Sequence, residues 1–572
     1  MQMVNLAIDN VKVSIMKGST ILEAARKACI NIPTLCHHPD LKVRASCRIC
    51  LVEVKGWRKL VTACSTPVKE GMEVITNSNW ARGARKTVLE LILADHNQDC
   101  LKCIRNRNCE LQKLAYEFNI NKNTFEFLSL KNKLTIDDTN PAIVRDPNKC
   151  IKCGRCIEVC HNIQSVGVIN NAFRSFDMQV TTPFKKPLTE TNCVYCGQCA
   201  AVCPVGAIYE KDDTEKVWNV LDNPDLHVIV QIAPAVRVSI GEELGMKSGS
   251  IVTGKAVAAL RRLGFHKVFD TDFAADLTIM EEGSELLERI KNGGILPMIT
   301  SCSPGWINFV EKFYPELLPH VSTCKSPQQM FGAIAKTYYA EKSGIPAEKI
   351  FVVSIMPCTA KKYEAARPEM SSSGFRDVDV VLTTRELGRM IRNAGIDFES
   401  LDSEEFDLPL GISTGASIIF GSSGGVMEAA LRTVYKKITG KELEVPDFKD
   451  VRGMYGIKEM EIDIEGNKIK AAVTNSLKNA RDVMEMIKRG EGGYTFIEVM
   501  CCPGGCIGGG GQPYGTSSEV REKRMDGLYD IDSSMETRKS HDNAAVIDLY
   551  KEYLGEPNGE KAHHLLHTSY KK

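Results

Sequence analysis

The chain has 572 residues, of which 43% are hydrophobic and 25% charged, so several globular domains and a large core are expected. Lys plus Arg and Asp plus Glu both number 72, and this zero net charge argues against nucleic acid or an anionic membrane surface as the main partner. Cysteine is the outlier, with 22 residues. The start of the sequence shows no export signal and no apolar run approaches membrane-spanning length, so we expect neither a disulfide framework nor membrane insertion.

Residues 1–79 are expected to form a small β-rich domain. Two alternating stretches, 4–8 and 11–15, flank Asp9 and Asn10, and Ser19 is the expected N-cap of a helix over 20–29. Four thiols follow at C-x10-C-x2-C-x13-C spacing: Cys36, Cys47, Cys50 and Cys64. Thiolates in fours suit zinc or iron–sulfur, but a zinc ribbon needs two C-x2-C pairs and this segment has one. The pattern resembles the 2Fe–2S β-grasp domain at the head of large redox enzymes.

Residues 80–125 combine a helix with a second ligand motif. Apolar residues recur at helical spacing over 81–94, which predicts a packing stripe formed by Val88, Leu89, Ile92 and Leu93. An H-x3-C-x2-C-x5-C motif follows: His96, Cys100, Cys103 and Cys109. Imidazole can replace thiolate on iron, so we expect a His-ligated 4Fe–4S cluster. A Cys3His zinc site is the alternative, since that ligand set also suits zinc.

Residues 126–210 contain an internal repeat. The pattern C-x2-C-x2-C-x3-C occurs twice, first at Cys150, Cys153, Cys156 and Cys160, then at Cys193, Cys196, Cys199 and Cys203. This is the signature of a two-cluster 4Fe–4S ferredoxin, in which the fourth cysteine of each run ligates the other cluster. We therefore expect Cys203 to complete the first cluster and Cys160 the second. Pro204 follows the second run, whereas His161 follows the first.

Residues 211–572 change to an α/β pattern. Buried strands are predicted at 228–232, 296–299, 350–354, 379–382 and 496–500, with helices between them, as at 254–263 and 387–393. A near match to a phosphate-binding loop at 249–256 has Ala256 where Ser or Thr should bind magnesium, so we expect no nucleotide site. The predicted class is a multidomain α+β and α/β protein.

Three motifs in this last region carry a family resemblance. They are T-S-C-S-P-G-W at 300–306, M-P-C-T-A-K-K-Y-E at 356–364 and E-V-M-C-C-P-G-G-C-I-G-G-G-G-Q-P at 498–513. Together they resemble the catalytic domain of iron-only (FeFe) hydrogenases, and with the N-terminal cluster motifs the resemblance to the long clostridial type covers essentially the whole chain. It implies reversible conversion of H2 to two protons and two electrons.

The resemblance also implies the cofactors and their ligands. The H-cluster is a 4Fe–4S cubane joined by one cysteine to a two-iron unit with CO, cyanide and azadithiolate; one 2Fe–2S and three accessory 4Fe–4S clusters complete the set. Cys358, Cys502 and Cys506 match cubane ligands, and Cys506 matches the bridge to the two irons. Lys361 matches a lysine that contacts cyanide. Met356 and Met500 match methionines packed around the two-iron unit.

A proton route is implied in the same way. Its matching residues are Glu282, Glu285, Arg289, Ser322 and Cys302; without the resemblance, the glutamates and arginine would be a solvated helix face. The family usually has two adjacent cysteines in the first motif, a proton donor and then a cubane ligand, but here Ser303 follows Cys302. Either Ser303 ligates through oxygen or Cys302 becomes the ligand. The extra thiols Cys324 and Cys501 compensate for the loss or are buried bystanders.

The expected partners follow from the family. Electrons would pass to ferredoxin, or to flavin-bearing NAD(P)-linked subunits of a multimeric, electron-bifurcating hydrogenase; the first motif and the tail over 555–570 favour the second. Maturation proteins and an anaerobic, cytoplasmic setting are also implied. The alternatives are a hydrogen sensor, an assembly protein or an electron-transfer protein on the same fold. The expected domains are a 2Fe–2S β-grasp domain (1–79), a His/Cys3 cluster domain (80–125), a two-cluster ferredoxin-like domain (126–210) and an α/β H-cluster domain (211–572).

Overall fold

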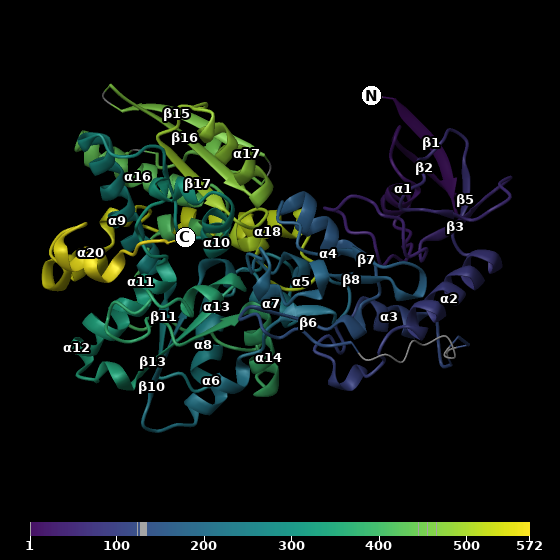
Figure 1. Cartoon of the computed structure of the whole chain (residues 1–572), viewed down its shortest axis with the longest axis horizontal. Coiled ribbons are helices and arrows are strands. Elements are labelled where there is room, and N and C mark those ends of the chain that lie inside the picture. Colours follow the sequence, from purple (N-terminus) through teal and green to yellow (C-terminus); the bar gives the residue numbers. More distant parts are fainter. Residues whose placement is uncertain are drawn as a thin grey trace.

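The structure is a computed structural model that describes residues 2–122, 124–125, 134–443, 445–454, 456–464 and 466–571. A large lobe contains the C-terminal part of the chain, and a smaller one contains the N-terminal sheet (Figure 1). The segment rich in cysteine lies between them. The expected boundary between residues 125 and 126 falls at residues 126–133, which lie outside the described residues.

The N-terminal unit is a five-stranded sheet in the order β2-β1-β5-β3-β4. Its strands are β1 (Met3–Ile8), β2 (Val11–Met16), β3 (Leu51–Val54), β4 (Val61–Thr62) and β5 (Glu73–Ile75). The β1–β2 hairpin turns at Asp9 and Asn10, both at positive φ, a conformation that these two residue types tolerate. Helix α1 (Ile21–Lys27) begins one residue later than predicted. Its N-cap is Thr20, not Ser19, because Thr20 forms a reciprocal capping box with Glu23.

The following segment is helical. It contains α2 (Asn79–Ala94), the short 3-10 helix η1 (Cys100–Lys102) and α3 (Glu110–Glu117). The predicted stripe of α2 faces inward, with Leu89 and Leu93 buried and Val88 and Ile92 packed at its edge. The stripe packs in the same core as the ferredoxin-like repeat, so it serves packing as predicted.

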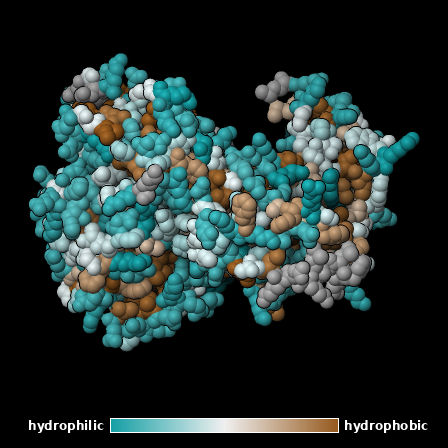
Figure 2. All heavy atoms as spheres, in the orientation of Figure 1, coloured by the Kyte–Doolittle hydropathy of each residue, from teal (hydrophilic) through white to brown (hydrophobic). Residues whose placement is uncertain are grey.

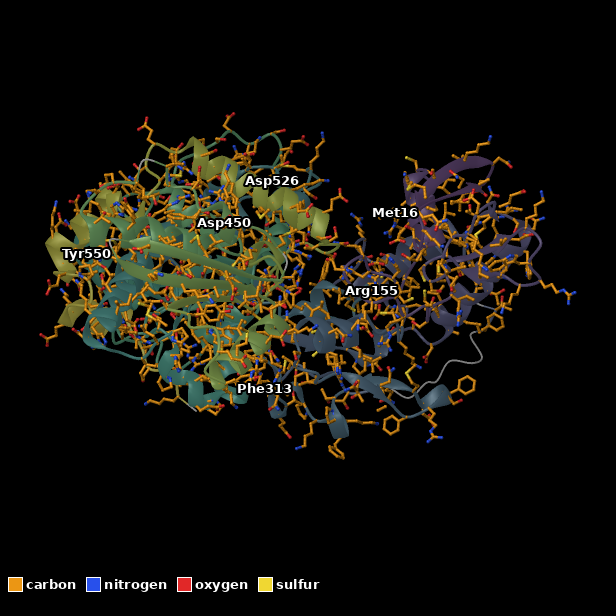
Figure 3. All side chains as sticks on the ribbon, turned by 90° about the horizontal axis from the view of Figure 1, so that it is seen from above. Met16, Arg155, Phe313, Asp450, Asp526 and Tyr550 are labelled. Atoms are coloured by element: carbon orange, nitrogen blue, oxygen red, sulfur yellow. The ribbon has the colours of Figure 1, made fainter. Side chains whose placement is uncertain are left out.

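The repeat segment is built from short elements: β6 (Ile143–Arg145), α4 (Arg155–Glu158), the π-helix η4 (Val159–Ile163), β7 (Asn170–Ala172), β8 (Gln179–Thr181), α5 (Gln198–Ala201) and β9 (Ile208–Glu210). Helices α4 and α5 each start after a glycine at positive φ, Gly154 and Gly197. Arg155, which lies where the two lobes meet (Figure 3), is buried and donates to the carbonyl of His37 and to Glu110. It therefore ties together three consecutive cysteine-bearing segments.

Two four-stranded sheets organise the large lobe. The first is fully parallel in the order β11-β10-β13-β14, and the second has the order β12-β17-β16-β15 with only β15 and β16 antiparallel. The strands are β10 (His227–Ile232), β11 (Lys267–Asp270), β12 (Met298–Ile299), β13 (Ile350–Met356), β14 (Val380–Thr383), β15 (Ile457–Ile464), β16 (Asn467–Asn475) and β17 (Phe496–Met500). The predicted strand at 296–299 is shorter because Pro297 has no N–H to donate. The prediction omitted β11, β15 and β16.

Helices cover both sheets, as expected for an α/β architecture. Those of the large lobe are α6 (Thr214–Leu221), α7 (Ile240–Glu243), α8 (Thr253–Arg262), α9 (Thr271–Asn292), α10 (Pro304–Phe313), α11 (Pro327–Ile334), α12 (Ala340–Ser343), α13 (Ala360–Ala365), α14 (Thr384–Asn393), α15 (Gly415–Ile418), α16 (Gly425–Thr439), α17 (Leu477–Lys488), α18 (Ser518–Ser534), α19 (Ala544–Leu549) and α20 (Glu560–Leu566). Among the described residues no helix has the length and apolar character needed to cross a bilayer. The face shown in Figure 2 is mostly hydrophilic, with small separate apolar groups.

Candidate active site

A cavity with about 820 Å³ of empty space, part of it open to solvent, lies where the carboxyl ends of the two sheets meet. Loops that follow parallel strands gather at this edge, which is why β13 and β17 deliver consecutive motif residues to it. The cavity brings together all three motifs. Its lining includes the motif residues Cys302, Ser303, Met356, Cys358, Lys361, Met500, Cys501, Cys502 and Cys506, and Cys196 of the ferredoxin-like repeat joins them.

The glycines after β17 let the backbone pass close to two other segments. A Cβ on Gly509 would lie 2.1 Å from the carbonyl oxygen of Pro357, and one on Gly510 would lie 2.3 Å from that of Cys196. Gly504 and Gly505 take positive φ, which glycine adopts without strain. These glycines therefore seat the cysteine loop directly against the second motif and the repeat.

The cavity's donor set fits an iron cluster. Cys358, Cys502 and Cys506 line it together, between apolar walls that include Met356 and Met500. Burial and the neighbouring Cys502 raise the pKa of Cys506 to about 12, so this thiol stays protonated at neutral pH unless a cation is bound. A coordinating metal removes such a proton outright, and thiolates are the preferred ligands of iron–sulfur clusters.

Lys361 places a positive charge at the cavity wall. Its Nζ donates to the carbonyl of Cys302 at 3.1 Å and to Glu364 at 3.0 Å. Glu364 also accepts from Ser326 and from Gln328, at 2.9 and 3.1 Å. The lysine is thus held in place beside a site suited to an anionic ligand. Gln328 lines the cavity too, although no sequence motif singled it out.

Ser303 and Cys501 are neighbours. Ser303 is the N-cap of α10, and its Oγ accepts from the Cys501 N–H at 3.2 Å. The Cys501 thiol lies beside Cys196 and Cys502, and a Cβ on Gly305 would be 2.6 Å from its Sγ. The glycine of T-S-C-S-P-G-W therefore leaves the space that this extra thiol occupies.

Three of the residues expected to carry protons, Glu282, Glu285 and Arg289, lie on α9, and Ser322 and Cys302 come from other segments. Glu285 accepts from Ser322 Oγ at 2.7 Å and pairs with Arg289 at 2.6 Å. Burial and repulsion by Glu285 raise the pKa of Glu282 to about 8. The Glu282 carboxylate has no hydrogen-bond partner of standard geometry among the described residues, although the Ser322 hydroxyl and the Ser301 N–H lie close enough to oppose part of this rise in pKa. Burial, reinforced by Glu282, also raises the pKa of the Cys302 thiol, which lines the cavity.

A further buried carboxylate was not predicted. Glu498, at the centre of β17, accepts from the N–H groups of Gly424 and Met427, both at 2.7 Å, at the start of α16. Burial raises its pKa to about 7. Glu498 anchors α16 beside the strand that carries the cysteine loop. An acidic residue inside the otherwise apolar strand F-I-E-V-M was the available signal.

The repeat cysteines line two further cavities. One holds Cys150, Cys153, Cys156 and Cys203, and the other holds Cys160, Cys193, Cys196 and Cys199. Each group combines three cysteines of one run with the fourth of the other, which is the exchange that the spacing predicts. In the N-terminal unit the cysteines approach in two pairs. Cys36 N donates to Cys47 Sγ, and Cys50 Sγ lies beside Cys64 Sγ, each at 3.4 Å.

His96 is suited to binding a metal. Burial lowers its pKa to about 4, so the imidazole is neutral, and its Nδ1 has no hydrogen-bond partner among the described residues. A neutral ring nitrogen with a free lone pair is the form that metals bind. Cys103 of the same motif lies against the repeat, since a Cβ on Gly206 would be 2.6 Å from its Sγ.

Comparison with known families gives matches along most of the chain. Residues 1–79 match the 2Fe–2S iron–sulfur cluster binding domain, 85–124 the NADH-ubiquinone oxidoreductase-G iron–sulfur binding region and 149–207 the 4Fe–4S dicluster domain. Residues 226–510 match the C-terminal domain of the iron-only hydrogenase large subunit. Residues 518–572 match the iron hydrogenase small subunit.

Individual relatives extend over the same length. The NADP-reducing hydrogenase subunit HndD of Solidesulfovibrio fructosivorans is 50% identical, with 100% of this chain and 99% of that protein covered. Iron hydrogenase 1 of Clostridium pasteurianum is 42% identical, with 100% of both chains covered. A solved structure on stepwise [FeFe]-hydrogenase H-cluster assembly, of HydA(deltaEFG), is 44% identical with a TM-score of 0.58, covering 63% of this chain and 99% of the other.

Proposed function

The chain belongs to the iron-only (FeFe) hydrogenases, oxidoreductases that interconvert H2 with protons and electrons, and from this premise we propose which of its residues carry the reaction. The observation that carries the proposal is the cavity shared by the three motifs. It combines buried thiols, a fixed lysine and apolar walls, with Cys196 of the repeat on one side and α9 near the other. Electrons and protons can thus reach the site from different directions.

Cys358, Cys502 and Cys506 would hold the cubane, and Cys506 would also hold the two-iron unit. When bound, this group supplies the open iron site and the basic amine at which H2 is split or formed. Lys361 would orient the unit through its cyanide. Met356 and Met500 exclude water with soft apolar side chains, so the residues supply binding and orientation while the cofactor supplies the chemistry.

We assign the fourth cubane ligand to Cys501. A four-iron cluster takes four ligands and prefers thiolate, for which a serine hydroxyl is a poor replacement. Cys501 lines the same cavity as the other three thiols and contacts Ser303, the residue at the position where the family has a ligand. This assignment leaves Cys302 free for proton transfer.

Protons would travel along Arg289, Glu285, Ser322, Glu282 and Cys302. Arg289 fixes the Glu285 carboxylate near the surface, and Ser322 already donates to it. Glu282 is protonated at neutral pH because its pKa is raised to about 8, so it can give up a proton and recover one near working pH. The buried Cys302 thiol would hold the proton at the cavity wall, where the route ends.

Electrons would leave through Cys196 and the repeat. We propose two 4Fe–4S clusters there, a third at His96, Cys100, Cys103 and Cys109, and a 2Fe–2S cluster at Cys36, Cys47, Cys50 and Cys64. Support comes from the two cysteine-lined cavities and from the free Nδ1 of His96. We propose four domains, one for each function. Residues 1–79 would hold the 2Fe–2S cluster, 80–125 the His-ligated cluster, 126–210 the two clusters of the repeat and 211–572 the H-cluster.

For electron partners we propose NAD(P)-linked, flavin-bearing subunits in the cytoplasm. The name of the HndD relative, an NADP-reducing hydrogenase subunit, supports this choice. Soluble ferredoxin is the competing acceptor, and maturation proteins would install the two-iron unit. Purification of the chain from its native host under anaerobic conditions tests the choice. A chain that never co-purifies with a flavoprotein excludes the multisubunit form.

Infrared spectroscopy of the matured protein tests the catalytic assignment. Bands from iron-bound CO and cyanide are expected, together with more iron than the accessory clusters alone contain. Absence of the bands, with iron matching only the accessory clusters, would overturn the proposed site.

A further inference from the structure

A second group of metal-binding side chains lies beside the proposed proton route. Glu285 of α9, Cys324 in the loop before α11 and His567 after α20 are all buried, and their ligand atoms lie within 4.8 Å of one another. The C-terminal tail is fixed there by backbone pairing, since Lys325 N–H donates to Leu566 and Thr568 N–H donates to Thr323. The tail therefore delivers His567 to this position as part of the fold.

The orientation of His567 is set by a second carboxylate. Nε2 lies 3.0 Å from Glu281 Oε2. An ionised carboxylate only accepts hydrogen bonds, so Nε2 carries the hydrogen and Nδ1 keeps its lone pair. Tyr550, at the end of the large lobe far from the N-terminal sheet (Figure 3), and the Asn558 N–H donate to the same Glu281 carboxylate. This carboxylate–histidine pair is the arrangement that orients histidines toward zinc.

The Nδ1 lone pair accepts a hydrogen bond from the Thr323 hydroxyl at 2.7 Å, and the other two groups lie close to the same nitrogen. Cys324 Sγ lies 4.0 Å from His567 Nδ1 and 3.8 Å from Glu285 Oε2. With Zn–S near 2.3 Å and Zn–N or Zn–O near 2.0 Å, a tetrahedral site separates such ligands by about 3.6 Å. The two spacings that involve sulfur are a few tenths of an ångström longer, and Nδ1 lies within 4.8 Å of the Glu285 carboxylate, so side-chain rotation has to close the site around the ion.

We propose that Glu285, Cys324 and His567 form a zinc-binding site. Sulfur, imidazole nitrogen and carboxylate oxygen are together a zinc ligand set. The Thr323 hydroxyl, now hydrogen-bonded to Nδ1, turns away to admit the ion, and a water completes four-coordination. Binding releases the Cys324 thiol proton to solvent. The ion enters beside Arg289 and Glu285, whose side chains are 14% and 11% exposed.

Zinc at this site would block turnover, a consequence that rests on the proposed proton route. The Glu285 oxygen nearest Cys324 is also the one that accepts from Ser322 Oγ, at 2.7 Å. A zinc ion bound to that oxygen takes the lone pairs that the proton transfer needs. Zinc is therefore expected to inhibit hydrogen oxidation and evolution alike, reversibly with a chelator.

The test uses the matured holoenzyme, in which the cluster cysteines already hold iron. Purified protein is stripped with a chelator and titrated anaerobically with zinc chloride, following hydrogen uptake, bound zinc and zinc-edge X-ray absorption. One zinc per chain with a sulfur neighbour is expected. Cys324→Ala should keep its basal activity but need at least about 10-fold more zinc for half-inhibition, the usual effect of weakening a metal site.

Two controls separate the outcomes. Cys29→Ala removes an exposed thiol in the N-terminal unit and should leave zinc inhibition unchanged. Cys324→Ser keeps a polar atom at the γ position but removes the sulfur, and should behave like Cys324→Ala. Equal zinc sensitivity in wild type and both Cys324 variants, or a zinc shell without sulfur, overturns the site. Zinc bound through sulfur without inhibition supports the site and overturns the passage of protons through Glu285, while the infrared bands report independently on the hydrogenase assignment.

Discussion

The two sides of the catalytic cavity are built on different principles. On the side of the repeat, the segments pack closely around backbone carbonyls. The Gln198 side-chain amide donates to the carbonyl of Gly508 and the Thr359 hydroxyl to that of Tyr195, each at 2.8 Å, and the Gly510 backbone lies against that of Cys196. On the side of α9, buried carboxylates and hydroxyls follow one another. Electrons cross closely packed protein without a chemical group at each step, whereas a proton needs a donor and an acceptor in hydrogen-bond reach. The side of the repeat therefore needs glycines and rigid packing, whereas the side of α9 needs side chains whose pKa values are shifted toward neutral pH.

The largest effect is expected at Cys506, because electron transfer and proton chemistry would both depend on the cofactor that its sulfur holds. Cys506→Ser replaces the thiolate proposed to join the cubane and the two-iron unit, so hydrogen turnover should fall below detection and the infrared bands of CO and cyanide should vanish. The accessory clusters should remain, as measured by iron content and electron paramagnetic resonance. Cys29→Ser, at an exposed thiol, is the matched control. Retained infrared bands in Cys506→Ser would contradict the assignment.

The next prediction concerns the electron side alone. Cys501→Ala, in protein produced without maturation and so lacking the two-iron unit, should lose about four iron atoms per chain and the cubane's resonance signal, because a four-iron cluster depends on its fourth ligand. Ser303→Ala should keep both. The reverse pattern, with the cluster lost in Ser303→Ala and kept in Cys501→Ala, would show that the serine oxygen is the ligand.

The proton side is tested by Glu282→Gln. The amide cannot carry the proton, and loss of a positioned acid–base group lowers rates by about 10²- to 10⁴-fold. The infrared bands and iron content should be unchanged, since Glu282 holds no cluster. Glu288→Gln, exposed on the same helix, should retain wild-type activity. A Glu282→Gln enzyme with normal turnover would exclude this route.

The contrast between the two sides also explains what the sequence could predict. Cysteine spacing predicted the two groups of thiols that line the cavities of the repeat, including the exchange of Cys160 and Cys203 between runs. Such spacing is visible because ligands to one cluster come from short, regular segments. The strands β10, β13 and β17 were predicted for a similar reason, since continuous apolar runs mark buried parallel strands.

Features that depend on distant segments could not be predicted in the same way. Glu281, Cys324 and His567 come from three separate parts of the chain, and only the paired C-terminal tail brings them together. Strand β15 alternates between exposed and partly buried residues, and Lys468 and Lys470 interrupt β16, so neither strand shows the apolar run that revealed the others. The contact between Ser303 and Cys501 likewise depends on how α10 packs beside β17.

The smallest effect is a change in how stability depends on pH. Burial, with Glu285 nearby, raises the pKa of Glu282 to about 8, so the folded chain keeps a proton that the unfolded chain loses near pH 4.5. The contribution of Glu282 to stability is therefore complete below about pH 4.5 and is lost as pH rises toward about 8. Glu282→Gln removes this titration. As pH rises through that window, the free energy of unfolding of the variant should therefore increase relative to that of wild type, by at most about 1.4 kcal/mol per pH unit.

Anaerobic thermal unfolding at pH 5.5 and pH 7.5, at one scan rate, measures this difference. The unfolding temperature of wild type should fall further from pH 5.5 to pH 7.5 than the unfolding temperature of Glu282→Gln. Glu288→Gln should behave like wild type. Parallel curves for all three proteins would mean that Glu282 titrates near its ordinary range. The carboxylate would then be ionised at neutral pH, and the proton side would lack the tuned acid that distinguishes it from the electron side.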